Sequence, residues 1–433
     1  MSKPKNNTLA RAPFSGTGLG CPVAGSKDLP LAWIHYLRQT YETFKSAKKF
    51  LPAPMHKAQA AAVAAAQSAM EKDPAKTFAC LTSPAVGTGL HCRVFRDNFP
   101  AFTQQIEERV RQVTPNLLLE FAESGLLRGK AEWPHPAPAI GSPRLGFCLA
   151  APQGASGWRF TNGRVEALKD GRGAGEIDLK NLETPSPVRV DRLFFDLNGI
   201  ARFSTYDPNP VAAFEEHPDK PGSVATLGGK PVADWTVSLE RSIGLVEKYC
   251  PEWAQEMRTL LQVIVPVGYY DEKHLSASYR EAIGVIYMTL HENDLVMLTA
   301  LIHEFQHNKI HAAAYGDPFL HNAHYPLFKS PVRPDPRPLW GILLAVHAFL
   351  PVAVVLRRLR EADEPAIQKE TLEWMMGDYD LKNHEGMEML RKNAEWTKTG
   401  RELFDVLDEL DRTHMREREK LGLPTKPTHV HHD

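Results

Sequence analysis

The stretch Gly284–Ala312, GVIYMTLHENDLVMLTALIHEFQHNKIHA, joins three patterns that decide the expected fold. Its opening run, GVIYMTL, is uninterrupted and apolar and has the length of a buried strand. Asn293 and Asp294 follow as candidate N-caps of a helix. The helix itself begins with the apolar DLVMLTALI and reaches two histidines that frame a glutamate, His303 and His307, in an HExxH motif. The stretch therefore predicts a strand followed by a buried, metal-binding helix.

Residues four apart on a helix share one face, so His303 and His307 can direct imidazole nitrogens at one ion. Glu304 lies to the side, near an open coordination position. The alternative is a chance HExxH on an amphipathic helix with exposed histidines. The strand, the cap and the apolar run around the motif favour the metal site.

The metal needs a third protein ligand. The metzincin pattern is excluded because Ile310 and Ala313 stand where it requires glycine and histidine. His347 is the preferred candidate, because it lies in a long apolar segment where an imidazole without a partner is costly; a core histidine bonded to a backbone carbonyl is the alternative. The other candidates are His311 one turn further along the helix, His321 and His324 in a loop, and the carboxylates Glu361 and Asp363.

Two linked motifs carry a family resemblance. LIHEFQHNKIHA, followed by SPVRPDPRPLWGILLAVHAFLPVA, resembles the HExxH-motif family of peptide-modifying proteins from gene clusters for ribosomally made, post-translationally modified peptides. The likeness covers mainly residues 284–356. It implies a non-haem Fe(II) enzyme that uses 2-oxoglutarate and O2 to hydroxylate side-chain β-carbons of a precursor peptide, on a scaffold similar to zinc peptidases.

Under this resemblance, His303, His307 and His347 hold the iron, and the keto acid and O2 take the three remaining positions. Arg337, with Arg333 second, binds the distal carboxylate of 2-oxoglutarate, because a guanidinium binds carboxylate in bidentate fashion. The alternative for both arginines is a surface loop paired with Asp335. Glu304 then orients a ligand or water and is not the base.

The sequence leaves alternatives open for the third metal ligand, for the function and for the role of the strand before the motif. Many relatives have histidine where this chain has Phe349, so the third ligand stays open between His347 and the other candidates. The rival function is a zinc metallopeptidase in which Glu304 is the general base on a zinc-bound water. A third reading is a pseudoenzyme that binds peptide in the same groove. The run GVIYMTL is a candidate sheet edge for an extended peptide substrate, or simply part of the core.

The composition excludes several partners. The 51 Lys and Arg residues balance 52 Asp and Glu residues, so the chain has no general attraction to nucleic acid or to an anionic membrane. Leu339–Leu356 is long and uncharged, but its central His347 and Pro351 and the charged residues after it favour a helix buried in protein. Five scattered cysteines and no secretory signal predict reduced thiols and a cytoplasmic protein.

The expected fold is α+β and mainly helical, with a zinc-peptidase-like core whose HExxH helix packs on a small antiparallel sheet. Two Asn-Gly pairs, at Asn162-Gly163 and Asn198-Gly199, predict hairpins. Composition divides the chain into a flexible arm (1–30), a helical region with a break near Pro115 (31–135), a β-rich region (136–235), the metal-binding core (236–360) and a C-terminal helical region with a tail (361–433).

Overall fold

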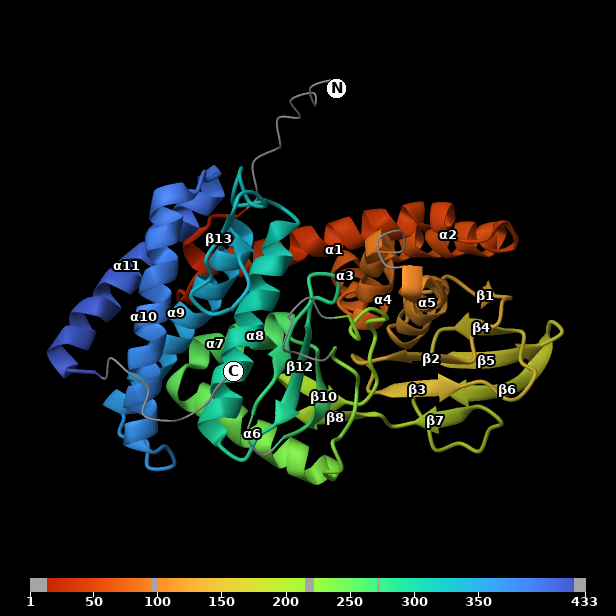
Figure 1. Cartoon of the computed structure of the whole chain (residues 1–433). Helices are drawn as coiled ribbons and strands as arrows, with labels where there is room; N and C mark the ends of the chain where they lie inside the picture. Colours follow the sequence, from red (N-terminus) through yellow and green to blue (C-terminus); the bar gives the residue numbers. More distant parts are fainter. Residues whose placement is uncertain (1–13, 96–99, 215–221, 271–272, 424–433) are drawn as a thin grey trace, which may run out of the picture. The chain divides into compact units, whose positions relative to one another are not determined.

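The computed structural model describes residues 14–95, 100–214, 222–270 and 273–423. Helices take up 53% of the described residues and strands 16%, so the fold is α+β and mainly helical, as expected. Contacts divide it into two compact units (Figure 1). The described parts of Met1–Tyr36 and Lys309–Thr428 form the helical unit, and those of Leu37–Asn308 form the sheet unit. The divisions fall inside two helices, whereas composition placed them at other points.

The helical unit is built on three long helices near the end of the chain, blue in Figure 1. They pack around an apolar cluster that includes Ile342, Leu350 and Leu403, all fully buried. Its elements are η1 (Thr17–Leu19), the start of α1 (Asp28–Ser46), the end of α8 (Asp294–Ala314), β13 (Leu327–Phe328), β14 (Arg337–Pro338), α9 (Leu339–Glu361), α10 (Lys369–Asn393) and α11 (Lys398–Leu421).

Helix α9 carries the long apolar segment. Within the described residues it is the one helix long and apolar enough to cross a membrane by length and composition, and 72% of its most apolar window is buried inside the protein. Pro351 lies inside this helix without ending it. Burial of this kind is what the core helix of a globular unit requires, so the interpretation as a protein-buried helix is supported.

The expected flexible arm covered residues 1–30, but residues 14–30 are ordered against the helical unit. Residues 1–13 lie outside the described residues. Phe14 and Leu19 are buried in the core of the helical unit. The backbone N–H of Gly16 donates to Glu402 at 3.1 Å, and a Cβ at Gly16 would lie 2.0 Å from the Thr399 carbonyl oxygen. Glycine is therefore needed here for close approach to α11, which composition could not reveal.

The sheet unit begins with helices. They are the remainder of α1, η2 (Ala47–Phe50), η3 (Ala53–Met55), α2 (His56–Lys72), α3 (Pro74–Leu81), α4 (Pro84–His91), η4 (Cys92–Phe95), η5 (Pro100–Phe102) and α5 (Thr103–Glu123). The expected break near Pro115 is wrong, because α5 runs through it without interruption. The turns around Pro115 are almost completely buried, and that packing offsets the one hydrogen bond that proline removes.

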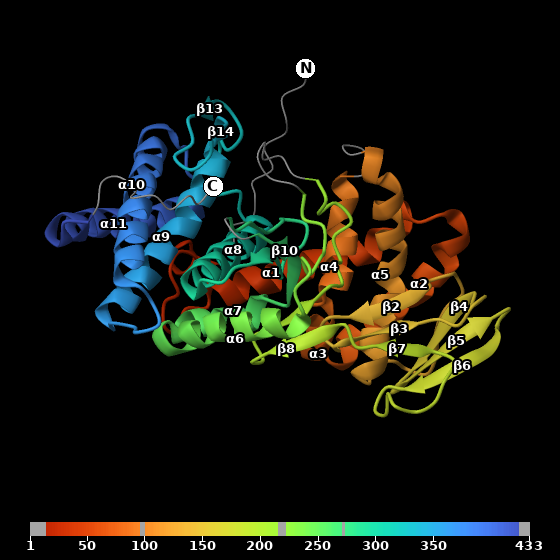
Figure 2. The ribbon, with the colours of Figure 1, turned by 60° about the horizontal axis from the view of Figure 1, so that its bottom comes forward.

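Two antiparallel sheets follow, shown in yellow in Figure 2. The four-stranded sheet has the order β1-β4-β5-β6 and the three-stranded sheet the order β2-β3-β7. Their strands are β1 (Ala131–Trp133), β2 (Ala139–Ser142), β3 (Phe147–Ala150), β4 (Gly157–Thr161), β5 (Arg164–Lys169), β6 (Arg172–Asp178) and β7 (Arg189–Asp191).

Both Asn-Gly hairpins are confirmed, at β4–β5 and β8–β9. At the second, Asn198 and Gly199 have φ of 53° and 66°, as the turn chemistry requires. At the first, only Gly163 has positive φ, 79°. Asn162 instead exchanges two side-chain hydrogen bonds with the backbone of Leu127, at 3.0 and 2.9 Å. A tertiary contact therefore shapes that turn.

The remaining sheet has five strands in the order β11-β12-β10-β9-β8. Its strands are β8 (Phe194–Leu197), β9 (Ala201–Ser204), β10 (Val263–Tyr269), β11 (Ser276–Ala277) and β12 (Val285–Leu290). It is mixed, not antiparallel, because β10 pairs in parallel with both β9 and β12. The helices α6 (Val232–Tyr249) and α7 (Pro251–Leu260) connect β9 to β10, a crossover of the kind that parallel neighbours need.

Strand β12 is the predicted GVIYMTL strand, and all six of its residues are buried. It lies between β11 and β10, so of the two alternatives left open by the sequence, a sheet edge or a core strand, the core strand is confirmed. Its continuous apolar run is explained by this position, since a strand buried on both faces has no need of polar alternation. Among the described strands, the short β11 forms the edge on that side.

Candidate metal centre

The motif helix α8 begins where the sequence predicts. The Asn293 side chain accepts a hydrogen bond from the Leu295 N–H at 2.9 Å, and its carbonyl accepts from Val296 and Met297. Asn293 is therefore the N-cap. Asp294, the first helical residue, is held by Arg241 through two guanidinium nitrogens, the shortest contact being 2.9 Å.

His303 and His307 are half-buried and lie on one face of α8. Their Nε2 atoms are 3.0 Å apart and their ring centroids 4.5 Å apart. With metal–nitrogen bonds of about 2.1 Å, two donors at neighbouring positions of one ion lie about 3.0 to 3.4 Å apart, from octahedral to tetrahedral geometry. The pair therefore fits one divalent ion as two neutral imidazole donors.

Glu304 is buried, with 2% of its surface exposed, and both of its carboxylate oxygens are engaged. Oε1 accepts a hydrogen bond from the Ser276 hydroxyl at 2.7 Å, and Oε2 accepts one from the Ser278 hydroxyl at 2.8 Å. Hydrogen bonds to a charged carboxylate stabilise it more than neutral ones do. The carboxylate is therefore held toward β11, at a defined orientation.

Asn308, the residue after the motif, is fully buried and ties α8 to the start of β12. Its Oδ1 accepts from the Gly284 N–H at 2.7 Å, and its Nδ2 donates to the Val285 carbonyl at 3.1 Å. Nδ2 also donates to the Glu304 carbonyl at 3.1 Å. The amide thus pairs with the backbone of β12 much as a neighbouring strand would, and sets the rotation of the motif helix.

His347 lies on α9 and is fully buried. Its Nε2 lies 2.8 Å from the Leu19 carbonyl oxygen. A carbonyl only accepts, so Nε2 carries the proton and Nδ1 carries the lone pair. This is the tautomer in which a metal-ligating histidine is usually held by its second nitrogen, and it equally satisfies a core histidine. The contact fits both alternatives that the sequence left open.

The other candidate ligands are spread over the helical unit. His311 is buried, with its ring centroid 6.2 Å from that of Trp340. His321 and His324 are exposed in the loop before β13. Glu361 and Asp363 are exposed at the end of α9, about 20 Å along the helix from His347 at 1.5 Å per residue. The two carboxylates are thus solvated, at a distance from the preferred α9 histidine.

The two candidate arginines share one carboxylate. Arg333 donates to Asp335 through Nε and Nη2, at 2.8 and 3.2 Å, and these bonds lower the pKa of Asp335 to about 2. Arg337 reaches Asp335 through Nη1 alone, at 3.3 Å. Arg333 is thus the arginine bound in bidentate fashion. The Arg337 guanidinium makes one long contact, to Asp335. It also packs closely against Gly341, where an added Cβ would lie 3.0 Å from the Arg337 Nε.

The structure brings together His303 and His307, while Glu304, which stands between them in the sequence, is held toward β11 by two serines. Within residues 14–95, 100–214, 222–270 and 273–423, no group of three or more His, Cys, Asp and Glu side chains lies together in a way that could hold a metal ion. His347 and both arginines belong to the helical unit, whereas the motif belongs to the sheet unit. The third ligand therefore remains a prediction.

Three residues of the site were missed from the sequence. Ser276 and Ser278 are separated by one residue, in LSASY, so a strand would place both on one face. Asn308 directly follows the motif. Only the paired serines had a detectable pattern, because neither their distance to Glu304 nor the contacts of Asn308 can be inferred from spacing along the chain.

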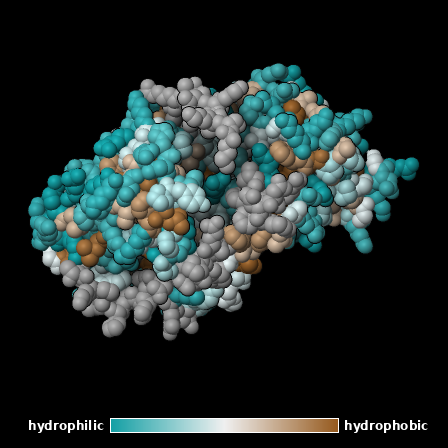
Figure 3. Space-filling model, turned by 45° about the horizontal axis from the view of Figure 1, so that its top comes forward, coloured by the Kyte–Doolittle hydropathy of each residue, from teal (hydrophilic) through white to brown (hydrophobic). Residues whose placement is uncertain are grey.

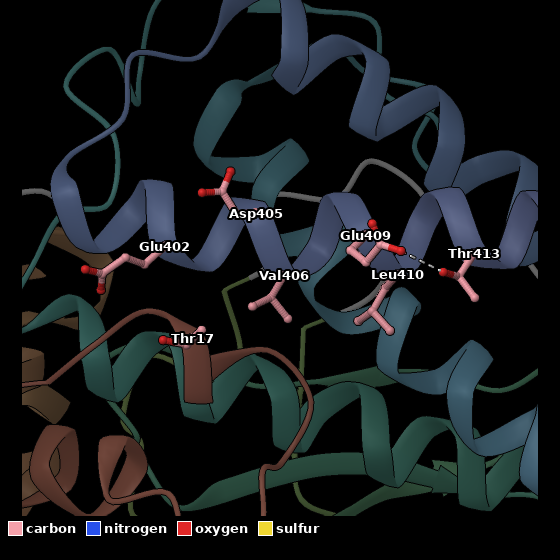
Figure 4. Close-up of a pocket in the computed structure, with 7 residues that line it drawn as sticks. All are labelled: Thr17, Glu402, Asp405, Val406, Glu409, Leu410 and Thr413. Carbon is pink, nitrogen blue, oxygen red and sulfur yellow. Dashed lines mark hydrogen bonds between the residues drawn. The ribbon is translucent and has the colours of Figure 1, made fainter.

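One surface groove lies apart from all of these residues, in the helical unit (Figure 4). It is lined by Thr17, Glu402, Asp405, Val406, Glu409, Leu410 and Thr413. Figure 4 shows Val406 and Leu410 projecting from α11 toward the side on which Thr17 lies. On the face drawn in Figure 3, hydrophobic residues lie in small groups separated by hydrophilic ones. None of the predicted site residues lines the groove.

Comparison with known proteins adds no further assignment. The chain matches no protein-family model, and no curated protein is significantly similar to it.

Proposed function

We propose that the protein is a non-haem Fe(II)- and 2-oxoglutarate-dependent oxygenase that hydroxylates a side-chain β-carbon of a ribosomally made peptide. The proposal rests on the motif resemblance and on one structural observation. Both carboxylate oxygens of Glu304 accept hydrogen bonds from serines, at 2.7 and 2.8 Å. A general base must reach a metal-bound water, and this carboxylate is already held by other donors. The observation supports an orienting role for Glu304.

In this proposal His303, His307 and His347 hold the iron, on a scaffold similar to that of zinc peptidases. The bound iron would supply oxygen activation with 2-oxoglutarate as the co-substrate. Neutral imidazoles suit such a metal, and the two motif nitrogens lie 3.0 Å apart. Asn308 and the two serines keep the motif helix and Glu304 in one orientation relative to β11 and β12.

Arg337 would bind the distal carboxylate of 2-oxoglutarate, with Arg333 as the second candidate. Arg333 already makes two hydrogen bonds to Asp335, whereas Arg337 makes one of 3.3 Å. Breaking the 3.3 Å bond between Arg337 and Asp335 costs less free energy than a bidentate pair between Arg337 and a carboxylate ligand would gain. This supports the choice of Arg337. Asp335, whose pKa is lowered to about 2, stays charged and keeps Arg333 in place.

The alternative is a zinc metallopeptidase with Glu304 as the general base. It needs the same two histidines, and it needs Glu304 to accept a proton from a metal-bound water through a lone pair that the serines leave unused. The two serine bonds orient the carboxylate toward β11, and the alternative requires that this orientation also faces the metal-bound water.

The deciding experiment is an anaerobic titration of the metal-free protein with Fe(II) and 2-oxoglutarate. The oxygenase predicts the weak visible charge-transfer band of a bidentate keto-acid complex, and its loss on admission of O2. Arg337→Ala should need a higher 2-oxoglutarate concentration, while the matched change Arg401→Ala, on α11 beside Asp405, should behave as the wild type. No band, with one tightly held zinc by elemental analysis, would return the assignment to a hydrolase.

A further inference from the structure

Strand β11 is the edge of the mixed sheet nearest the motif. It pairs with β12 on one side, with Ser276 opposite Met288 and Ala277 opposite Tyr287. No described strand pairs with its other side. Ser276, Ala277 and Ser278 are each half-buried, so the edge is partly accessible.

The hydrogen-bond pattern shows which backbone groups point outward. The Thr289 N–H donates to the Leu275 carbonyl at 2.8 Å, so Leu275 points its carbonyl at β12. In an antiparallel pair the pointing direction alternates, so Ala277 also faces β12. The N–H and C=O groups of Ser276 and Ser278 then face away from the sheet. No residue in the described part of the chain makes a hydrogen bond with these outward backbone groups.

The same two serines contact the motif through their side chains. Residues two apart on a strand share a face, and both hydroxyls donate to Glu304. An extended chain that pairs with Ser276 and Ser278 would therefore run beside Glu304, which lies between the two metal-binding histidines. The residues that carry the outward backbone groups are thus linked to the motif by the two hydrogen bonds from their hydroxyls to Glu304.

We infer that the peptide substrate binds as an added strand on the outer edge of β11. This deepens the proposed function and rests on it for the claim that the ligand is a substrate. Backbone donors and acceptors that alternate along an edge match an extended polypeptide and no compact metabolite. Recognition through the backbone leaves alternate substrate side chains directed to the two faces of the sheet, one of which carries the motif.

The test is amide hydrogen exchange of the Ser276 N–H in the metal-free full-length protein. The probe is a pool of terminally blocked, randomised octapeptides at about 1 mM, because backbone pairing does not depend on sequence. Binding at ten times the dissociation constant should slow exchange at Ser276 about tenfold. The same pool with alternate amides N-methylated cannot complete the ladder and should give no protection.

A matched pair of variants isolates the backbone. Ser278→Ala and Ser278→Pro both remove the hydroxyl that reaches Glu304, but only proline removes the outward N–H. Protection of Ser276 should persist in Ser278→Ala and be lost in Ser278→Pro. No protection in the wild type, or equal protection by the N-methylated pool, would overturn the inference.

The experiment uses neither iron nor 2-oxoglutarate, so its outcome is independent of the proposed chemistry. Protection at β11 without a keto-acid complex would retain the peptide edge and reject the oxygenase. A keto-acid complex without protection would retain the oxygenase and reject β11 as the substrate edge.

Discussion

Ser276 donates a hydrogen bond of 2.7 Å to Glu304, the residue between the two motif histidines. This bond, with that from Ser278, orients the carboxylate toward β11 and favours a positioning role for Glu304 over that of a general base. Glu304→Gln should therefore keep peptide hydroxylation within about tenfold of wild type. In a peptidase the same change removes general-base catalysis, which is worth about 10²- to 10⁴-fold. Turnover of one peptide, scored for both hydroxylated and cleaved products by mass spectrometry, decides between the two.

Gly341→Ala tests Arg337 without removing it. A Cβ at position 341 would lie 3.0 Å from the Arg337 Nε and 3.3 Å from its Cβ, so the Arg337 side chain must give by a few tenths of an ångström. A hydrogen bond to a charged group contributes about 1.5 to 3 kcal/mol, so losing one should raise the 2-oxoglutarate dissociation constant about 10- to 100-fold. Isothermal titration with 2-oxoglutarate measures this. Unchanged affinity, with an unchanged melting temperature, would remove Arg337 from the binding site.

Asn308→Ala should destabilise the sheet unit. The substitution leaves the Gly284 N–H and the Val285 carbonyl buried without the amide that pairs with them. Each lost partner costs about 1 to 3 kcal/mol, so a total of about 3 kcal/mol is expected in urea denaturation. Asn308→Asp should cost at least as much as alanine, because it keeps the acceptor for Gly284 but places a buried carboxylate oxygen against the Val285 carbonyl. A cost below about 0.5 kcal/mol would show that the amide does not hold the helix.

His347→Ala separates the ligand from the core histidine. As a third ligand, its removal should lower Fe(II) affinity at least about tenfold, as seen for changes around metal sites. As a core histidine bonded to the Leu19 carbonyl, its removal should lower stability and leave metal affinity unchanged. Metal titration followed by a thermal melt of the same sample gives both quantities. His384→Ala, a half-buried histidine of α10 paired with Asp411, is the matched control.

Asp207 predicts a pH dependence within the sheet unit. Burial raises its pKa from 3.8 to about 6, while the Tyr287 hydroxyl, at 2.5 Å, partly opposes the shift. Between these pH values the folded protein keeps a proton that the unfolded chain has lost. The stabilisation is thus complete below about pH 4 and is lost as pH rises through 6, by up to about 3 kcal/mol.

The comparison of wild type with Asp207→Asn isolates this effect, because asparagine does not titrate. The free energy of unfolding of the variant should rise relative to wild type between pH 4 and pH 7. A constant difference across that range would mean that Asp207 titrates normally.

The strand, the capped helix and the histidine spacing were all predictable because each depends on residues close together in the chain. Asn293 caps α8 as expected, and β12 occupies the GVIYMTL run. The features that the sequence did not determine depend instead on contacts between residues far apart in the chain. Pro115 stays inside α5 because packing offsets its missing donor, and the choice between a sheet edge and a core strand for β12 depends on its pairing with β11. Propensity and periodicity describe a segment alone, whereas these outcomes depend on its neighbours.

The sequence by itself determined a mainly helical α+β protein with a capped, apolar helix that presents two histidines on one face. Only the tertiary structure decided that Glu304 is held by Ser276 and Ser278, and that β11 carries the sheet edge beside it. The physical reason is range: helix period and capping act over about four residues, while the serines stand more than twenty positions before the glutamate that they hold.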